Sequence, residues 1–210
     1  MAEPLDILFG SAARVKLLRF FLFNPSKVML FDEVSKRARL VRRTARTEMS
    51  ALERAGVIRQ RSIYMDVEGK DRKLKAVGYM LNKEFPELQA LQTFLFETAP
   101  IDGKNLLRHL REAGPLDFVG VSGVFVRDFE QRLDVLLAMK SFSQAKVEKA
   151  IRSLEAEIGL DIRFAAMSSE DLKYRVGMYD KLTRDFFDYP HQVLIDRINI
   201  GDEVRTSTFR

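Results

Sequence analysis

The sequence predicts an α+β fold built from two parts of different character. In residues 1–82, helical spacing of apolar side chains gives way to two β-branched and aromatic runs joined by a polar, glycine-containing segment. In the second half, short apolar runs typical of strands alternate with longer runs of helical spacing. Charge follows the same division: residues 1–82 hold 17 Lys and Arg against 9 Asp and Glu, whereas residues 83–210 hold 18 against 21. We therefore expect a basic domain followed by a slightly acidic one.

Composition narrows the chemistry that the chain can carry. Its 210 residues are 46% apolar and 31% charged, which is typical of a protein that is folded throughout. There is no cysteine, so disulfides, thiolate metal sites and cysteine nucleophiles are excluded, and His109 and His191 are the only imidazoles. The N-terminus lacks a basic and apolar leader, and no apolar run is long enough to span a bilayer. We expect a cytoplasmic protein that has no membrane partner.

Helical spacing predicts three helices in the first domain, at about residues 11–23, 32–38 and 41–55. Ser11 has a side chain suited to capping the first helix, and Asn24-Pro25-Ser26 ends it. Residues 39 and 40 are expected to form the turn between the second and third helices. The predicted order is helix, helix, turn, helix.

The third predicted helix has an apolar face and a basic face. Ala45, Met49 and Leu52 follow one another at spacings of four and three, so they share one face and should pack against the other helices. The outward face then carries Arg42, Arg43, Arg46, Thr47 and Ser50. From Lys36 to Arg46, six side chains are basic and none is acidic. Arginines on such a face can grip the O6 and N7 atoms of guanine or hold phosphate.

A β-hairpin is expected after the third helix. Gly56 suits the left-handed end of a helix, and residues 57–65 and 74–81 should pair as strands. The polar residues 66–73 between them form the expected tip. Three basic side chains of that tip, Lys70, Arg72 and Lys73, are placed to touch backbone phosphate or the minor groove.

This half resembles the winged helix-turn-helix transcriptional regulators of the ArsR and MarR kind. The resemblance covers nearly all of residues 8–82 and rests on the order helix, helix, helix, hairpin. Residues 49–58, Met-Ser-Ala-Leu-Glu-Arg-Ala-Gly-Val-Ile, look like the end of a recognition helix and the start of a wing. One departure is Val41-Arg42, where a Ser or Thr cap is usual. The candidate DNA-binding residues are Lys36, Arg37, Arg39, Arg42, Arg43, Thr44, Arg46, Thr47, Lys70, Arg72 and Lys73.

The resemblance implies a transcriptional regulator whose partner is double-stranded DNA. Because winged helices commonly read two half-sites as a pair, a homodimer is expected. Two alternatives stay open at this point. In the first, the basic helix face is only a solvated surface. In the second, the winged helix contacts another protein.

The second part begins with a connecting segment, residues 83–100. Leu88, Leu91, Phe94 and Leu95 share one face of a helix expected over residues 88–97, and that face is either domain core or the seam of a dimer. An α/β domain over residues 101–200 and a disordered polar tail over residues 201–210 are expected to follow. The expected helices span about 105–113, 143–158, 168–176 and 179–187, and the expected strands span about 116–122, 133–139, 160–166 and 192–198.

The order strand, glycine-containing turn, strand with an acidic residue, helix and strand resembles the minimal nucleotidyltransferase domain of the polymerase β superfamily. In that family Gly-Ser follows the first strand, an Asp-x-Asp pair lies on the second, and a later strand supplies a third carboxylate. These groups hold two divalent metals that activate the attacking hydroxyl and bind the triphosphate. Here Gly120 matches the glycine, Asp134 matches the second aspartate of the pair, and Asp161 could match the third carboxylate.

Two positions depart from that pattern. Val121 stands where the serine would be, and Arg132 stands where the first aspartate would be. A guanidinium in place of a carboxylate changes the local charge by two units and would repel a metal. We therefore expect a degenerate site that has no catalytic residue, no metal and no cofactor.

Three readings of this degenerate site stay open. In the first, Asp134 is a structural residue and nothing binds. In the second, a vestigial pocket binds a nucleotide or another anionic effector, with Arg127 and Arg132 on phosphate. The residues of that pocket would be Gly120, Ser122, Arg127, Arg132, Asp134 and Asp161. In the third, the domain is an active transferase that modifies a protein or RNA partner, as antitoxins built on this domain can do.

Overall fold

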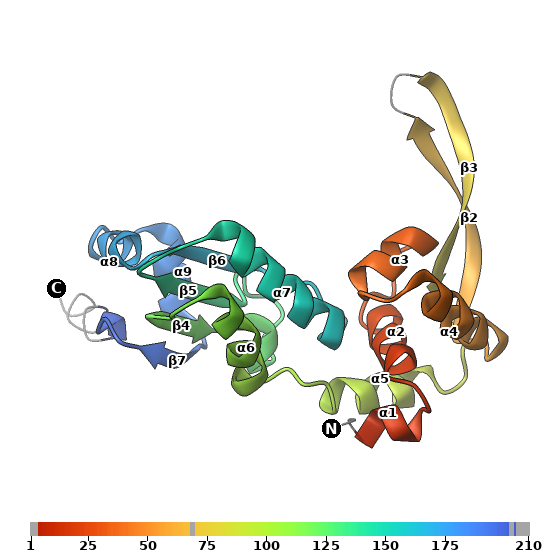
Figure 1. Cartoon of the computed structure of the whole chain (residues 1–210), viewed down its shortest axis with the longest axis horizontal. Helices are drawn as coiled ribbons and strands as arrows, with labels where there is room; N and C mark the ends of the chain where they lie inside the picture. The colour runs from red at the N-terminus through yellow and green to blue at the C-terminus, as the bar shows by residue number, and fades with distance from the viewer. Residues whose placement is uncertain (1–3, 68–69, 202–203, 205–210) are drawn as a thin grey trace. The chain divides into compact units, whose positions relative to one another are not determined.

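The computed structural model describes residues 4–67, 70–201 and 204, with the side chains of residues 65–73 left out. The chain is a mixed α+β protein with a three-stranded and a four-stranded sheet (Figure 1). It divides into two compact units. Unit 1 comprises Met1–Pro100 and Glu155–Leu160, and unit 2 comprises Ile101–Leu154 and Asp161–Arg210.

The helices of unit 1 are α1 (Pro4–Leu8), α2 (Ala12–Leu22), α3 (Phe31–Arg37), α4 (Arg42–Arg54) and α5 (Leu88–Glu97). The predicted helices begin and end within about two residues of α2, α3 and α4, whereas α1 was not predicted. Ser11 caps α2 as expected, because its hydroxyl accepts a hydrogen bond from the Arg14 amide. Helix α4 follows Val41, which offers no side-chain cap.

A long β-hairpin completes unit 1. Strand β2 (Ile58–Val67) pairs antiparallel with β3 (Lys70–Leu81), and the short β1 (Met29–Leu30) pairs with the other edge of β3. The predicted tip over residues 66–73 was too long, because β2 continues to Val67 and β3 begins at Lys70. The backbone ladder needs no apolar side chains to continue, so the polar composition of this segment misled the prediction. Figure 1 shows the hairpin extending well beyond the helices.

The core of unit 1 joins its helices to the base of the hairpin. Buried apolar side chains from α2, α3, α4 and the hairpin form one cluster, which also includes Leu95 of α5. Leu88 and Leu91 pack against this cluster, so the apolar face of α5 is largely domain core. Phe94 is 40% exposed and lies 6.5 Å, between ring centroids, from Phe9.

Unit 2 is built on the four-stranded sheet, in the order β6-β5-β4-β7. Strands β5 and β6 are parallel, and β4 is antiparallel to both β5 and β7. The strands are β4 (Phe118–Val121), β5 (Val135–Met139), β6 (Phe164–Ser168) and β7 (Gln192–Asp196). The main helices are α6 (Gly103–Leu110), α7 (Gln144–Ile158), α8 (Ser169–Gly177) and α9 (Lys181–Asp188), and short 3-10 turns span Arg111–Ala113 and Gly123–Val126. The last residues of α7, from Glu155, belong to unit 1.

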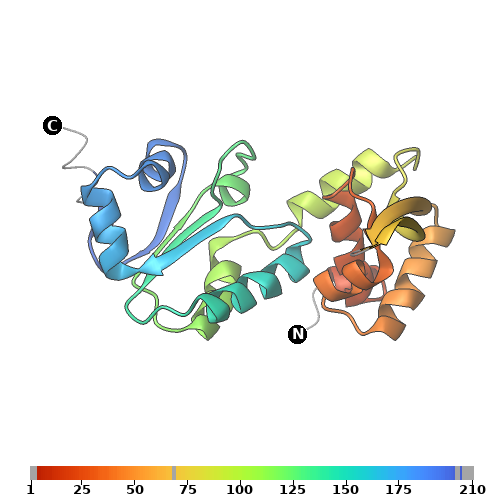
Figure 2. The same cartoon turned by 90° about the horizontal axis from the view of Figure 1, so that it is seen from above.

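Helices cover both faces of this sheet. Figure 2 shows α6 and α7 on one side of the sheet and α9 on the other. Phe118, Leu136 and Phe186 belong to a buried cluster that joins β4 and β5 to α9. The third predicted strand, residues 160–166, instead occupies Phe164–Ser168, because its ladder with β5 starts at the pair Val135 and Phe164. Among the described residues, no helix is long and apolar enough to cross a bilayer. Most of the predicted polar tail lies outside the described residues.

Candidate functional site

Helix α4 has the two faces that its spacing predicted. Ala45, Met49 and Leu52 are buried, with exposed fractions of 0%, 2% and 4%. The exposed residues are Arg42, Arg43, Thr44, Arg46, Thr47, Ser50 and Arg54. The hydroxyl of Thr47 donates a hydrogen bond to the Arg43 carbonyl oxygen at 3.1 Å, so this side chain lies back along its own helix. The buried face holds the helix in the unit and leaves the basic face to solvent.

Glu48 is an acidic residue on the inner face that the sequence pattern did not single out. It is 8% exposed, and its Oε2 accepts a hydrogen bond from Nε of Arg14 at 2.8 Å. On the helical wheel position 48 lies about 40° from Leu52 and about 60° from Ala45, at the edge of the apolar face, so the spacing alone could have placed it inside. The charge of Glu48 is thus paired with Arg14 of α2.

Two arginines of α4 lie over the first residues of α3. The guanidinium carbons of Arg42 and Arg46 are 5.4 and 5.3 Å from the ring centroid of Phe31. Nη1 of Arg42 is 2.6 Å from Oδ1 of Asp32. Neither Phe31 nor Asp32 was among the predicted site residues, because their role depends on where α3 packs relative to α4.

The other predicted cations of this region occupy different environments. Lys36 and Arg39 are exposed, and Arg39 has a left-handed backbone with φ of 52° in the turn between α3 and α4. Arg37 is half-buried, 5.0 Å from the ring centroid of Phe20 and 3.7 Å from the carboxylate of Glu33. Arg37 is therefore partly used in holding α3 to α2.

A groove of about 600 Å³ lies between α4, the start of α3 and strand β3. Arg42 and Arg46 form part of its wall, and Val77 and Tyr79 of β3 form another part. Among the described side chains of the hairpin, exposed cations that the sequence pattern did not single out are Arg59, Arg61 and Lys75. The sequence feature that could have identified them is the recurrence of a basic residue at every second strand position, as at Arg59 and Arg61. The backbones of Lys70, Arg72 and Lys73 lie in β3, but their side chains fall outside the described part of the chain.

In unit 2, Asp134 is fully buried and both of its oxygens are engaged. Oδ1 accepts hydrogen bonds from the Val124 amide at 3.0 Å and from Nη2 of Arg163 at 2.8 Å. Oδ2 accepts from the amide of Arg163 at 2.8 Å and from its Nε at 2.9 Å. These hydrogen bonds to Asp134 are the main reason that the pKa of Arg163 is raised. The guanidinium of Arg163 therefore neutralises this buried carboxylate.

Gly123, rather than Gly120, makes the close approach to this carboxylate. Gly123 has φ of +53°, and a Cβ at this position would collide with Oδ1 of Asp134. A Cβ at Gly120 would instead lie 2.7 Å from Cζ of Phe186, which gives Gly120 a packing role. The backbone of the turn after β4 thus packs directly against the Asp134 carboxylate, and only glycine fits at position 123.

These residues do not fit the pair of divalent metals that the nucleotidyltransferase resemblance implies. Arg163 occupies the coordination sites of Asp134, and Arg132 stands at the other carboxylate position. Within the described residues, no group of three or more His, Asp or Glu side chains could hold a metal ion. A metal would have to displace a bidentate guanidinium from a buried carboxylate.

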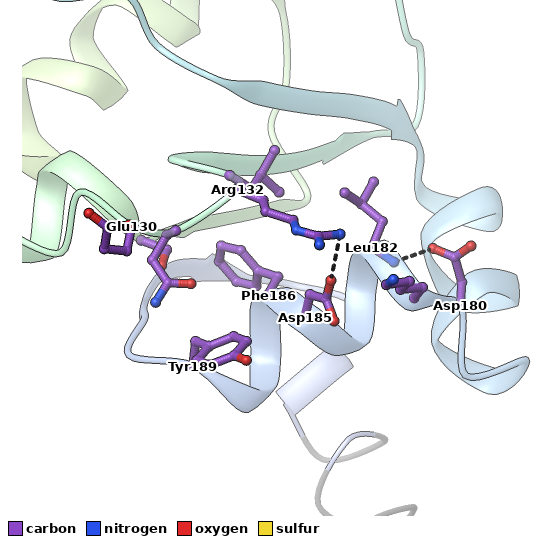
Figure 3. A pocket seen from close by; sticks show the side chains of 11 residues that line it. Glu130, Arg132, Asp180, Leu182, Asp185, Phe186 and Tyr189 are labelled. Carbon is purple, nitrogen blue, oxygen red and sulfur yellow. Dashed lines mark hydrogen bonds and ion pairs between the residues drawn. The ribbon is translucent and has the colours of Figure 1, made fainter.

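A pocket of about 740 Å³ lies beside this region (Figure 3). Ser122 and Arg132 line it together with Phe186 and Tyr189, whereas Gly120, Arg127, Asp134 and Asp161 are not among its lining residues. Arg127 and Asp161 are exposed, and Arg127 has a left-handed backbone with φ of 61°. The structure thus places only two of the six predicted nucleotide-site residues in one pocket.

One ion pair joins two of the charged groups that line this pocket. Nη1 of Arg132 lies 3.6 Å from Oδ2 of Asp185, as Figure 3 shows. Asp180 caps α9, accepting hydrogen bonds from the amides of Leu182 and Thr183. With Glu130 and Lys181 added, the lining carries three acidic groups against two basic ones. This balance does not favour a polyphosphate ligand.

Comparison with known proteins does not assign the chain to a family. No family model matches the chain, and no curated protein and no solved structure gives a significant match.

Proposed function

We propose that unit 1 is a winged helix that binds duplex DNA and that the protein is a transcriptional regulator. The observation that carries the proposal is α4, whose buried Ala45, Met49 and Leu52 leave a basic face outward. The order of helices α2, α3 and α4 followed by the hairpin β2–β3 also supports it. Double-stranded DNA is then the partner, with α4 in the major groove and the hairpin beside the backbone. Paired half-sites would make the protein a homodimer.

The binding of duplex DNA is expected to depend strongly on salt. Each phosphate neutralised by Lys or Arg releases condensed counterions, so log K should fall with log salt at a slope of about −0.9 per phosphate. The measurement is a titration of labelled duplex with the full chain at several salt concentrations, by fluorescence anisotropy. Absent or salt-insensitive binding of the duplex would rule out the proposal. A chain that shows no preference for duplex DNA would favour the alternative in which the winged helix contacts another protein.

We propose further that unit 2 is a degenerate nucleotidyltransferase-like domain that serves dimerisation or effector sensing. The succession of β4, a glycine turn, β5, α7 and a parallel β6 supports the likeness. The engagement of Asp134 by Arg163 supports the loss of activity, because a metal-binding carboxylate must have free lone pairs.

The alternative of an active transferase predicts a different result in a direct assay. We expect the full chain to transfer no label from radiolabelled nucleoside triphosphates to protein or RNA acceptors, with either Mg²⁺ or Mn²⁺. The physical reason is that neither Asp134 nor Arg132 can ligate the metal that such transfer needs. Label transfer that disappears in Asp134→Ala would establish the alternative and overturn the proposal for unit 2.

A further inference from the structure

We infer that Arg42 and Arg46 read guanine bases, and that Phe31 and Asp32 are positioning residues that hold these two arginines ready. The inference rests on the proposed DNA-binding function of unit 1. It specifies guanine as the base that is recognised, and it assigns base contact to Arg42 and Arg46 and phosphate contact to Arg43.

Phe31 provides a platform anchored in the unit. It is the first residue of α3, is partly buried and packs against the core cluster of unit 1. The guanidinium groups of Arg42 and Arg46 lie over its ring, 5.4 and 5.3 Å from the centroid. Residues four apart on a helix share a side, so one ring serves both arginines. Attraction between a cation and the ring face restricts both side chains before any ligand arrives.

Asp32 holds one edge of Arg42. Its Oδ1 is 2.6 Å from Nη1 of Arg42, while the two side chains are 66% and 67% exposed. An exposed ion pair of this kind contributes little to stability, so its effect is on orientation. Arginine has five N–H donors, so donors of the guanidinium remain for a second partner.

A held arginine suits a base edge better than a phosphate. Phosphate contact tolerates a mobile cation, whereas the bidentate contact with guanine O6 and N7 needs the planar fork in one orientation. A helix rises about 1.5 Å per residue, so Arg42 and Arg46 are separated by about 6 Å along α4. Base pairs rise about 3.4 Å, so the two arginines can reach guanines about two base pairs apart. Arg43 projects about 100° from Arg42 and about 60° from Arg46 around the helix, and it suits phosphate.

The test is selection of bound duplexes from a random-sequence pool by the full-length protein and three variants. The variants are Phe31→Leu, Asp32→Asn and, as the control, Glu33→Gln. Glu33→Gln removes the same charge one residue away, from a carboxylate that faces Arg37 rather than Arg42. Affinities for the selected duplex and for a guanine-substituted duplex are then compared, together with the salt slope of each variant.

The wild type is expected to select sites with guanines about two base pairs apart. Removal of the ring platform or of the Asp32 carboxylate should reduce discrimination against the guanine-substituted duplex by about 5- to 30-fold, with the salt slope unchanged. The control should discriminate as the wild type does. Asp32→Asn keeps the test decisive if Phe31→Leu lowers the melting temperature, because Asp32 is exposed.

The possible failures are distinguishable. If the wild type binds no duplex, the proposed function itself fails and the inference falls with it. If the wild type binds duplex without selecting guanine, or if Phe31→Leu and Asp32→Asn discriminate as the wild type does, the proposed function stands and the inference is overturned.

Discussion

Replacing Arg42, Arg43 and Arg46 together by alanine is expected to lower the affinity for duplex DNA by at least about 100-fold. A good bidentate contact with a base contributes about 1 to 3 kcal/mol of discrimination, and each phosphate left without its cation no longer releases counterions. The salt slope should become shallower by about 0.9 for each phosphate that the variant fails to neutralise. Affinity and slope are measured by fluorescence anisotropy with a selected duplex.

The control for this triple variant must remove the same charge elsewhere. Lys146, Lys149 and Arg152 are three exposed cations of α7 in unit 2. Their replacement by alanine lowers the net charge equally, so it reports the contribution of overall charge. The three replaced arginines are exposed, and unfolding temperatures should therefore stay close to that of the wild type. Equal losses of affinity in the two triple variants would mean that α4 is not the DNA-binding surface.

Arg163→Ala is expected to destabilise the protein by about 2 to 4 kcal/mol. The substitution leaves the carboxylate of Asp134, which has 0% exposed side-chain area, without its cation and without two side-chain hydrogen bonds. The side chain of Arg163 is itself 43% exposed, so the loss is placed below that of a fully buried pair. Denaturant unfolding followed by circular dichroism measures the change.

Two further variants separate charge from geometry at this pair. Arg163→Lys keeps the cation but loses the planar fork, so its loss should be intermediate. In the double variant Asp134→Ala with Arg163→Ala, no buried charge is stranded, and the total loss should be less than the sum of the single losses. Strict additivity would show that the two side chains do not stabilise each other, and Asp134 would then be available for another role.

Local patterns in the sequence predicted most of the elements. Ser11 and Ser168 each accept a hydrogen bond from an amide three residues on, as expected of helix caps. Spacing placed Ala45, Met49 and Leu52 on the buried face of α4, because a helical period relates neighbours along the chain directly. The same rules failed for residues 66–67 and 70–73, where polar residues belong to the paired strands β2 and β3.

The candidate sites were only partly predictable. The exposed arginines of α4 followed from the helical period, but the ring of Phe31 beneath two of them did not. In unit 2, Asp134 was selected by its position, whereas its partner Arg163 was missed. Asp134 and Arg163 are 29 residues apart and meet because β5 and β6 lie side by side. No periodic signal reports such a pairing.

The basic region that begins at Lys36 was determined by the sequence alone, since charge and helical spacing are properties of the chain itself. The same holds for the acidic balance of the second half and for the absence of thiol chemistry. Tertiary structure decided how individual charges are used. It paired Arg14 with Glu48 inside the unit, placed Arg42 and Arg46 on Phe31, and filled the acceptor sites of Asp134 with Arg163. A charged group takes its role from its nearest partners, and these partners come from segments that only folding brings together.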